Sequence, residues 1–263
     1  MLDLIYRIYG YLFAKLIFRK LNIFLYNLSI RGLGILNYQD EYLSGEKTWL
    51  KKYLKTINKP IVIDVGANVG NYSKAVIEFN NEATVFAFEP HPITFKNLAL
   101  NIKHEGFHIF NLGVSNEEGV MQLYDYHNND GSQHASVYKN VMMDLHQAEK
   151  ITSHMVNVVK LDEFIREKKI EYIDLLKIDV EGNELKVLRG CIDSLGAKKV
   201  RTIQFEFNEM NIVSKSSFKD FWDLLNDYKL YRILPGGALI PINNYSPINC
   251  EIYAYQNIIA TLK

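Results

Sequence analysis

The chain has few of the features that mark several classes of protein. It contains only two cysteines among 263 residues, Cys191 and Cys250, and they stand far apart. This excludes a disulfide framework and a CxxC metal motif, and it fits a reducing, cytoplasmic compartment in which both side chains are small buried groups. Lys plus Arg equals Asp plus Glu, at 30 each. Such a balance argues against binding of nucleic acid through a large net positive charge, so we expect no nucleic-acid partner.

The most apolar part of the chain, residues 1–28, also lacks a long uncharged run. Four basic residues interrupt it: Arg7, Lys15, Arg19 and Lys20. No segment therefore reaches the roughly 18 apolar residues that a membrane span needs. We expect one or two amphipathic helices that pack on the domain or on a second copy of the chain, or that touch a membrane surface. Residues 1–36 are the candidate segment for this peripheral membrane contact or homo-oligomer.

Strand patterns and helix patterns alternate from residue 60 onward. They follow one another at residues 61–66, 71–80, 83–90, 93–103 and 107–115. This rhythm predicts βαβ units, and therefore an α/β fold with a parallel sheet and helices on both faces. The second half adds two strands around a polar loop, a strand running into a helix, and a further strand, at residues 119–126, 155–160, 172–190 and 200–209. We divide the chain into a helical extension, residues 1–58, and the main domain, residues 59–263.

The first strand of this domain, IVIDV, runs into the turn GANVG. Gly66 and Gly70 let the backbone approach a ligand closely, and the helix behind them presents free N–H groups. In a doubly wound sheet, ligands bind at this carboxyl edge of the strands. Asp64 lies at the mouth of the turn. Glu89 ends the second strand, where it can accept hydrogen bonds from both hydroxyls of a ribose.

Two classes of nucleotide cofactor compete for this geometry. The turn lacks the GxGxxG spacing with which dinucleotide sites pack backbone against a pyrophosphate. An acid at the mouth would also repel a pyrophosphate, whereas it suits an ammonium or a sulfonium group. S-adenosylmethionine carries both groups, so we favour it over a dinucleotide. A glycine turn that binds nothing is the remaining alternative.

Polar side chains also occur on two later strands. Strand residues two apart share a face, so Lys177 and Asp179 point the same way. Gln204, Glu206 and Asn208 share a face of the next strand. Burying a charge is costly unless it is paired, so the presence of these polar residues on two central strands requires an explanation. Either Lys177 and Glu206 merely satisfy each other, or they belong to a reaction centre at the same edge of the sheet as the glycine turn.

Five segments together resemble the FkbM-type S-adenosylmethionine-dependent methyltransferases. They are, in chain order, IDVGANVGNYS, FAFEPHP, NLGVS, LLKIDVEGNELKVLRG and IQFEFNE. The resemblance implies a class I methyltransferase (Rossmann-like) fold, with a seven-stranded, mostly parallel sheet whose last strand is antiparallel. Residues 249–257 fit that last strand. Family members methylate hydroxyls, commonly on sugars and glycans, and some act on polyketides.

The resemblance also implies which residues bind the cofactor. The methionine end would be lined by Asp64, Gly66, Asn68 and Gly70. The ribose would be held by Glu89. Asn111 and Ser115 would lie near the adenine, unless they only cap a turn. Glu46 would lie near cofactor or substrate if its helix covers the pocket; otherwise its charge simply suits a helix N-terminus.

Methyl transfer to a hydroxyl requires alignment of oxygen, carbon and sulfur, and removal of the hydroxyl proton. Asp179 or Glu206 could act as the base, or His134 could be delivered over the pocket by its polar loop. Alternatively, a divalent cation, Mg²⁺ or Mn²⁺, could bind Asp179 and Glu206, with Asn208, and acidify the hydroxyl. Lys177 could orient a carboxylate or hold an anionic group of the substrate.

Three functions stay open from the sequence. The first is an O-methyltransferase for a sugar hydroxyl, on a nucleotide-linked sugar or a surface glycan precursor. The second is an O-methyltransferase with a lipid-like or polyketide acceptor, which the apolar N-terminus would serve. The third is a non-catalytic binding module that keeps the fold.

Overall fold

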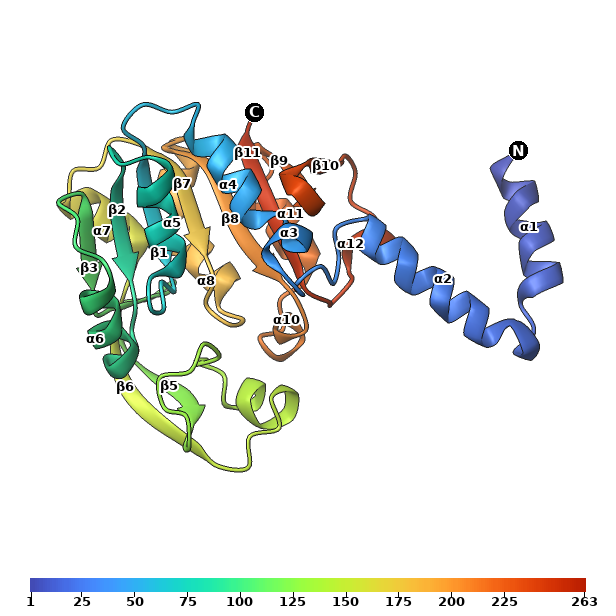
Figure 1. The fold of residues 1–263 in the computed structure, drawn as a ribbon, viewed down its shortest axis with the longest axis horizontal. Helices are drawn as coiled ribbons and strands as arrows, with labels where there is room; N and C mark the ends of the chain where they lie inside the picture. The colour runs from blue at the N-terminus through green and yellow to red at the C-terminus, as the bar shows by residue number, and fades with distance from the viewer.

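An eight-stranded sheet forms the centre of the protein, in the order β10-β9-β11-β8-β7-β1-β2-β3 (Figure 1). The computed structural model describes residues 1–263, apart from the side chain of Glu41. The strands are Leu239–Ile242 (β10), Tyr228–Ile233 (β9), Gln256–Leu262 (β11), Val200–Phe207 (β8), Ile173–Ile178 (β7), Ile61–Val65 (β1), Thr84–Phe88 (β2) and Phe107–Phe110 (β3).

Strand directions confirm the predicted mostly parallel sheet with an antiparallel last strand. β1 pairs in parallel with β2 and β7, and β7 pairs in parallel with β8. β11 runs antiparallel to both of its neighbours, β8 and β9. The sheet has eight strands rather than seven, because the chain turns back after β9 and adds the short antiparallel β10 at the edge.

The predicted position of the last strand was wrong. Of residues 249–257 only Gln256 and Asn257 belong to it: Pro247–Cys250 is a short helix, α12, and the strand begins only at Gln256. The physical reason is burial, because β11 lies between two strands and is covered on both faces. A strand in that place needs a continuous apolar run, which residues 258–260, Ile-Ile-Ala, supply and residues 249–255 do not.

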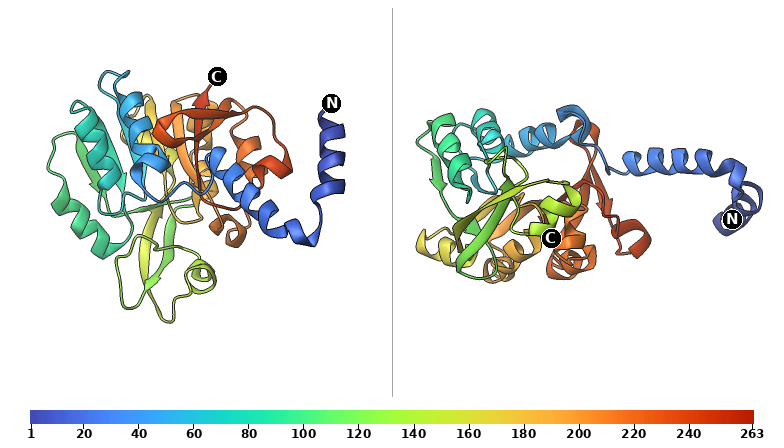
Figure 2. Two further views of the ribbon diagram at one scale, coloured as in Figure 1. Left: turned by 45° about the vertical axis from the view of Figure 1, so that its right-hand side comes forward. Right: turned by 90° about the horizontal axis from the view of Figure 1, so that it is seen from below.

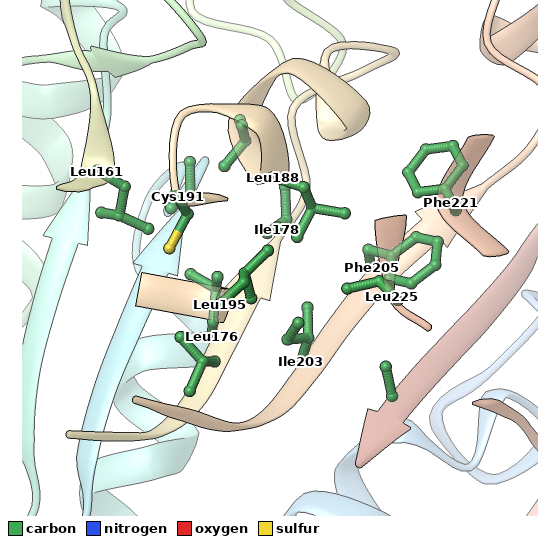
Figure 3. Close-up of a cluster of buried hydrophobic side chains, with 14 of the residues drawn as sticks. Leu161, Leu176, Ile178, Leu188, Cys191, Leu195, Ile203, Phe205, Phe221 and Leu225 are labelled. Atoms are coloured by element: carbon green, nitrogen blue, oxygen red, sulfur yellow. The ribbon is translucent and has the colours of Figure 1, made fainter. Parts of the chain in front are cut away.

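Helices cover both faces of the sheet. They are α4 (Glu46–Leu54), α5 (Asn71–Phe79), α6 (Pro92–Asn101), α7 (Leu161–Glu167), α8 (Glu184–Arg189), α9 (Ile192–Gly196), α10 (Met210–Val213) and α11 (Phe218–Leu224). Figure 3 shows one of the two cores, in which Ile178, Cys191 and Phe205 pack together. On the other face, Trp49 and Leu54 of α4 pack over the sheet. The two faces are built from alternate strand residues, as a pleated strand requires.

Both cysteines are fully buried, as predicted. α4 packs directly on the sheet, although the sequence placed it in the N-terminal extension. The division between residues 58 and 59 stays a prediction.

A second, three-stranded sheet lies beyond the carboxyl ends of β1, β2 and β7 (Figure 1). It has the order β4-β6-β5, with bounds Gly113–Val114 (β4), Ile151–Val159 (β6) and Gly119–Tyr126 (β5). The segment predicted as one strand at residues 107–115 therefore divides into β3 and β4. β5 matches its predicted bounds, and β6 begins four residues before its predicted start at residue 155. The connection between β5 and β6 carries the short helical turn η2, Val141–Leu145.

The N-terminal arm, residues 1–32, projects from the rest of the protein (Figures 1 and 2). It consists of α1 (Leu2–Phe13), η1 (Leu16–Phe18) and α2 (Arg19–Gly32). α1 buries none of its residues, and α2 buries only Ile30. The expectation that these helices pack on the domain is therefore wrong for nearly all of the arm. Among the described residues, no helix is long and apolar enough to cross a membrane.

Two short elements join the arm to the sheet. α3 (Glu41–Ser44) and η3 (Pro235–Gly237) contact each other and α4. Close to them the chain is anchored, because the N–H of Leu36 donates to the carbonyl of Tyr255 over 2.8 Å and Ile35 is fully buried. The segment that leads into α4 is thus held at the carboxyl edge of the sheet.

Candidate cofactor and acceptor cleft

A cleft of about 1080 Å³ lies between the carboxyl edge of the main sheet and the small sheet. Its lining comes from the β1–α5 turn, the ends of β2, β7 and β8, the N-terminus of α4, and strands β5 and β6. Pockets for single small molecules commonly measure roughly 300–1000 Å³. The cleft is therefore large enough to hold two molecules side by side.

The β1–α5 turn forms one end of the cleft and is tightly packed. Gly66 has a φ of 84°, and a Cβ atom on it would overlap the carbonyl oxygen of Asp179. Its N–H and that of Ala67 both donate to the carbonyl of Phe88, over 3.0 and 2.9 Å, which ties the turn to β2. Gly70, by contrast, packs against Leu98 of α6 and does not line the cleft. Gly66 thus shapes the cavity, whereas Gly70 lets α6 approach the start of α5.

Asp64 and Glu89 lie on neighbouring strands at the same end of the cleft. Asp64 is buried and accepts a hydrogen bond from the hydroxyl of Ser73 over 2.6 Å. Burial raises the pKa of Asp64 to about 6. The carboxylate of Glu89 accepts from the backbone N–H groups of Asn68 and His91, over 2.8 and 2.7 Å. Burial outweighs these bonds and raises the pKa of Glu89 to about 7.

Asn68 is held beside Glu89 in a left-handed conformation, with a φ of 51°. Its side-chain amide reaches the carbonyl of Ser132 in the β5–β6 connection over 3.4 Å. Asn68 therefore links the glycine turn to the polar loop that closes the cleft.

Lys177 lies at the centre of a group of acids where β7 and β8 end. Its ammonium group is 3.1 Å from Asp179 and 3.9 Å from Glu46. Burial of the side chain lowers its pKa, but the surrounding carboxylates, led by Asp179 and Glu46, raise it above the usual lysine value. Lys177 is therefore a fixed positive charge. In the described chain the ion-pair partners of Lys177 are Asp179 and Glu46. The isolated Lys177–Glu206 ion pair that the sequence left open as an alternative is therefore not observed.

Glu206 lies beside this group, at the end of β8. Burial, and then the negative charge of Asp179, raise its pKa well above the usual glutamate value. The amide of Asn208 donates to its carboxyl group over 3.4 Å. The proton of Glu206 is thus held more tightly than that of an exposed glutamate. By contrast, 39% of the Asp179 side chain is exposed.

Asn111 and Ser115 do not line the cleft. The amide of Asn111 donates to the carbonyls of Glu89 and Pro90, over 2.8 and 3.0 Å. Ser115 is buried, and its N–H donates to the carbonyl of Val159 over 3.0 Å. Residues 112–114 line the cleft between them. The two polar residues therefore hold this loop in place from outside the cavity.

Comparison with known proteins agrees with this geometry. A family profile described as the methyltransferase FkbM domain matches residues 64–233. This chain belongs to the FkbM methyltransferase family. The match begins at Asp64 and includes the glycine turn, Glu89, Lys177 and Asp179, whereas Glu46 of the Lys177 group lies before its start.

Three relatives show how far the similarity extends. Methyltransferase sdnD of Sordaria araneosa is 31% identical over 173 residues, covering 57% of this chain and 66% of that protein. The 2-O-methyltransferase NoeI of Sinorhizobium fredii is 24% identical over 190 residues, covering 68% of this chain and 76% of that protein. The hexuronic acid methyltransferase AglP of Haloferax volcanii is 26% identical over 191 residues, covering 72% of this chain and 71% of that protein. The chain thus spans just under two thirds of sdnD.

The sequence placed the polar loop around His134 over the pocket, but it did not place strands β5 and β6 on the opposite wall of the FkbM-domain cleft. Six of its residues are apolar and come from the small sheet and its loop: Met121, Leu123, Ala135, Val137, Val156 and Val158. The alternating pattern in residues 119–126 and 155–160 predicted the strands, but it did not indicate which surface they would cover.

Two polar residues of this region were also missed, Glu181 and His146. Glu181 adopts a φ of 52° directly after β7, and its carbonyl accepts from the hydroxyl of Ser136 over 2.8 Å. The side chain of predicted His134 lies 3.5 Å from the Glu181 carboxylate, and its ring is 4.7 Å from that of His146. The KIDVEG segment carried a usable signal, because Glu181 follows the end of a central strand by a few residues.

The predicted metal set fits this geometry poorly. The side-chain oxygen of Asn208 accepts from the N–H of Met210 over 2.9 Å, and its amide nitrogen faces Glu206. Among the described residues, the His, Cys, Asp and Glu side chains that gather within metal-binding reach form two other groups. These are His91 with Asp130 and His154, and His134 with His146 and Glu181.

Proposed function

We propose that this protein is an S-adenosylmethionine-dependent O-methyltransferase that methylates a sugar hydroxyl, on a nucleotide-linked sugar or a surface glycan precursor. One observation carries the proposal: Asp64, Glu89 and the Lys177 group all lie at one edge of the sheet in one cleft. Membership of the FkbM family supports the reaction class. The sugar acceptor is supported by two relatives whose names state a 2-O-methyltransferase and a hexuronic acid methyltransferase.

The cofactor-binding part of the proposal rests on donors and charges. Each oxygen of Glu89 accepts one backbone N–H and retains a lone pair, so an ionised Glu89 can receive two ribose hydroxyls. The N-terminus of α5 presents backbone N–H groups to the methionine end of the cofactor, and Gly66 leaves room for it. The buried Asp64 faces the methionine end with its negative charge. S-adenosylmethionine supplies an electrophilic methyl group on a positively charged sulfur.

Deprotonation of the acceptor is assigned to Asp179. Its side chain is partly exposed, lines the cleft and is oriented by the ammonium of Lys177 over 3.1 Å. The hydroxyl oxygen bonds to the methyl carbon as the carbon–sulfur bond breaks, its electrons stay on sulfur, and the proton goes to Asp179. Because burial and the charge of Asp179 raise the pKa of Glu206, we assign it the role of a hydrogen-bond donor to the acceptor rather than that of the base.

The alternative is an oxygen-ligated cation, Mg²⁺ or Mn²⁺, at Asp179 and Glu206. We rank it second, because Lys177 already supplies positive charge beside Asp179 and the oxygen of Asn208 is used by the backbone.

The proposal is tested by incubating the protein with S-adenosylmethionine and a panel of nucleotide sugars. Products are measured by mass spectrometry for the gain of one CH₂ group. We expect at least one sugar to gain this mass, and an Asp179→Asn variant to lose turnover while it still binds S-adenosylhomocysteine. Turnover only on long-chain or polyketide alcohols would establish the second acceptor class, and cofactor binding without turnover on any alcohol would establish the binding-module alternative.

For the N-terminal arm we propose contact with an anionic lipid surface. Residues 1–32 carry five basic residues and one acidic residue, and large apolar side chains such as Leu4, Ile8 and Phe24 are at least half exposed. Apolar side chains beside basic ones suit a helix lying in a lipid interface.

Vesicle co-sedimentation tests the arm. We expect binding to vesicles that contain phosphatidylserine, and loss of that binding in an Arg19→Glu, Lys20→Glu variant. The same charge reversal should leave S-adenosylhomocysteine binding unchanged. A stable dimer in solution that does not bind these vesicles would assign the arm to a second copy of the chain instead.

A further inference from the structure

Two side-chain groups of similar composition join the small sheet and its loop to the main sheet, yet they differ in what their atoms do. Each combines two histidines with an acid, and in each the candidate ligand atoms lie within 4.8 Å of one another. The first is His91, Asp130 and His154. The second is His134, His146 and Glu181, all of which line the cleft.

The first group is satisfied by its own hydrogen bonds. The Nδ1 atom of His91 faces the backbone N–H groups of Ile93 and Thr94, over 3.3 and 3.4 Å. Because those groups can only donate, Nδ1 is the acceptor, and the proton of the neutral ring is on Nε2. This nitrogen donates to Asp130 over 2.9 Å, and His154 approaches the same carboxylate over 2.8 Å. The group is a brace that connects α6 to the small sheet.

The second group has unused ligand capacity. Nε2 of His146 is buried and has no hydrogen-bond partner in the described structure. A buried nitrogen without a partner is unfavourable, and it marks a place where a bound group would restore the lost interaction. His134 reaches Glu181 only over 3.5 Å, and 49% of the His134 side chain is exposed to the cleft side. Nothing in this group corresponds to the backbone donors that fix His91.

We propose that His134, His146 and Glu181 form a site for a divalent cation of the zinc type. Two imidazoles and a carboxylate are the ligands of many catalytic zinc sites, which keep a fourth position open. A tetrahedral zinc with bonds of about 2.0–2.2 Å places its ligand atoms roughly 3.4 Å apart. Small side-chain rotations that move each ligand atom by about 1 Å would therefore bring the three atoms to zinc-binding distance. Imidazole ligands favour zinc over Mg²⁺, which prefers oxygen.

The open position of this site faces the cleft that also contains Asp179. A cation there can lower the pKa of an acceptor hydroxyl and orient it, so that Asp179 removes the proton more readily. The role of the cation in acidifying the acceptor hydroxyl rests on the proposed O-methyl transfer, whereas the binding of the cation to these three side chains does not depend on it.

Calorimetry on chelator-treated protein, titrated with ZnCl₂ and with MgCl₂, tests the site. We expect one zinc per chain and no comparable Mg²⁺ binding. His146→Ala and Glu181→Gln should weaken zinc binding at least about 10-fold, because even the loss of a partner that only orients a ligand typically costs about 10–100-fold. His134→Ala is the safest variant for the fold, because its side chain is half exposed. His154→Ala, in the brace, is the matched control and should keep zinc binding.

Each outcome decides the assignment. Absence of zinc binding in the unmodified protein, or binding that is lost in His154→Ala and kept in His146→Ala, overturns it. S-adenosylhomocysteine binding is measured in the same samples and should be unchanged by all four substitutions. If zinc binds as expected but S-adenosylhomocysteine does not, the cation site stands and the proposed function fails.

Discussion

The two walls of the cleft are built in different ways. The wall that we assign to the cofactor comes from β1, β2 and the turn between β1 and α5, and hydrogen bonds from the backbone and from the hydroxyl of Ser73 hold its acids in place. Glu89, for example, accepts from two backbone N–H groups. The wall that we assign to the acceptor comes from the small sheet and its loop, and it presents apolar and imidazole side chains.

This difference suggests which part of the cleft is constrained by the fold and which part can change between relatives. A backbone-held carboxylate keeps its position whichever side chains surround it, which suits a cofactor of constant structure. Side chains on a short sheet can be exchanged without disturbing the main fold, which suits an acceptor that differs between relatives. Substitutions in the two walls should therefore have effects of different kinds.

The largest effect should follow Gly66→Ala on the cofactor wall. The new Cβ would overlap the carbonyl of Asp179, and the residue would be forced to keep a φ of 84°. We expect a loss of about 3–5 kcal/mol in the free energy of unfolding, measured by urea denaturation.

Gly236→Ala is the control for this loss. Gly236 also has a positive φ, of 71°, but a Cβ there would meet nothing within 4 Å. It should lose only about 1 kcal/mol. Equal losses in the two variants would show that the contact with Asp179 does not constrain the turn.

Lys177→Met should have the next largest effect. It removes the cation that Asp179 and Glu46 face and leaves their charges beside the half-buried Glu206. Because Asp179 is partly exposed, we expect a destabilisation of about 2–3 kcal/mol at pH 8, below the usual loss for a fully buried pair. Lys139→Met, at an exposed position in the acceptor loop, should change stability by less than about 0.5 kcal/mol. A stable Lys177→Met protein would mean that the acids are well solvated.

The pH dependence of cofactor binding should follow Glu89. Its pKa of about 7 means that the carboxyl group gains a proton as the pH falls through 7. Ribose hydroxyls need an acceptor, so S-adenosylhomocysteine affinity should rise with pH and fall up to about 10-fold per unit below pH 7. Calorimetry from pH 6 to 8 measures this slope. Glu89→Gln, which cannot titrate, should bind more weakly and with a flatter profile; an unchanged slope would assign the titration to another group.

The smallest effect on stability should come from His134→Ala on the acceptor wall. Half of its side chain is exposed, so unfolding should change by less than about 0.5 kcal/mol. Cofactor affinity should stay within about twofold, while the rate of methyl transfer should fall at least about 10-fold, which is less than the roughly 10²–10⁴-fold contribution of a group that itself removes the proton. A rate that does not change would remove His134 from the acceptor site.

The sequence predicted the cofactor wall better than the acceptor wall, for a physical reason. Asp64, Gly66 and Glu89 stand at strand ends, and parallel strands bring their carboxyl ends to one edge wherever the rest of the chain lies. Asn111 and Ser115 were assigned by position within a motif, but in the structure they donate to backbone carbonyls and do not line the cavity. It was likewise easier to predict that a last strand exists than to predict where β11 begins. β11 is buried on both faces, so its sequence lacks the alternating pattern that would mark its first residue.

The acceptor wall depends on contacts between segments that are distant in sequence. His134 and Glu181 are 47 positions apart, and they meet only because the small sheet folds over the end of β7. No local pattern in the β5–β6 connection indicated His146 as their neighbour. The exposed arm was also beyond local prediction, because an amphipathic pattern predicts an apolar face and not what will cover it.

The most direct test of the account is the calorimetric titration of S-adenosylhomocysteine into the unmodified protein and into Glu89→Ala and His134→Ala at pH 8. The account predicts one saturable site in the unmodified protein and in His134→Ala, and no detectable binding in Glu89→Ala. Binding that survives in Glu89→Ala, or that disappears in His134→Ala, would contradict the assignment of the two walls.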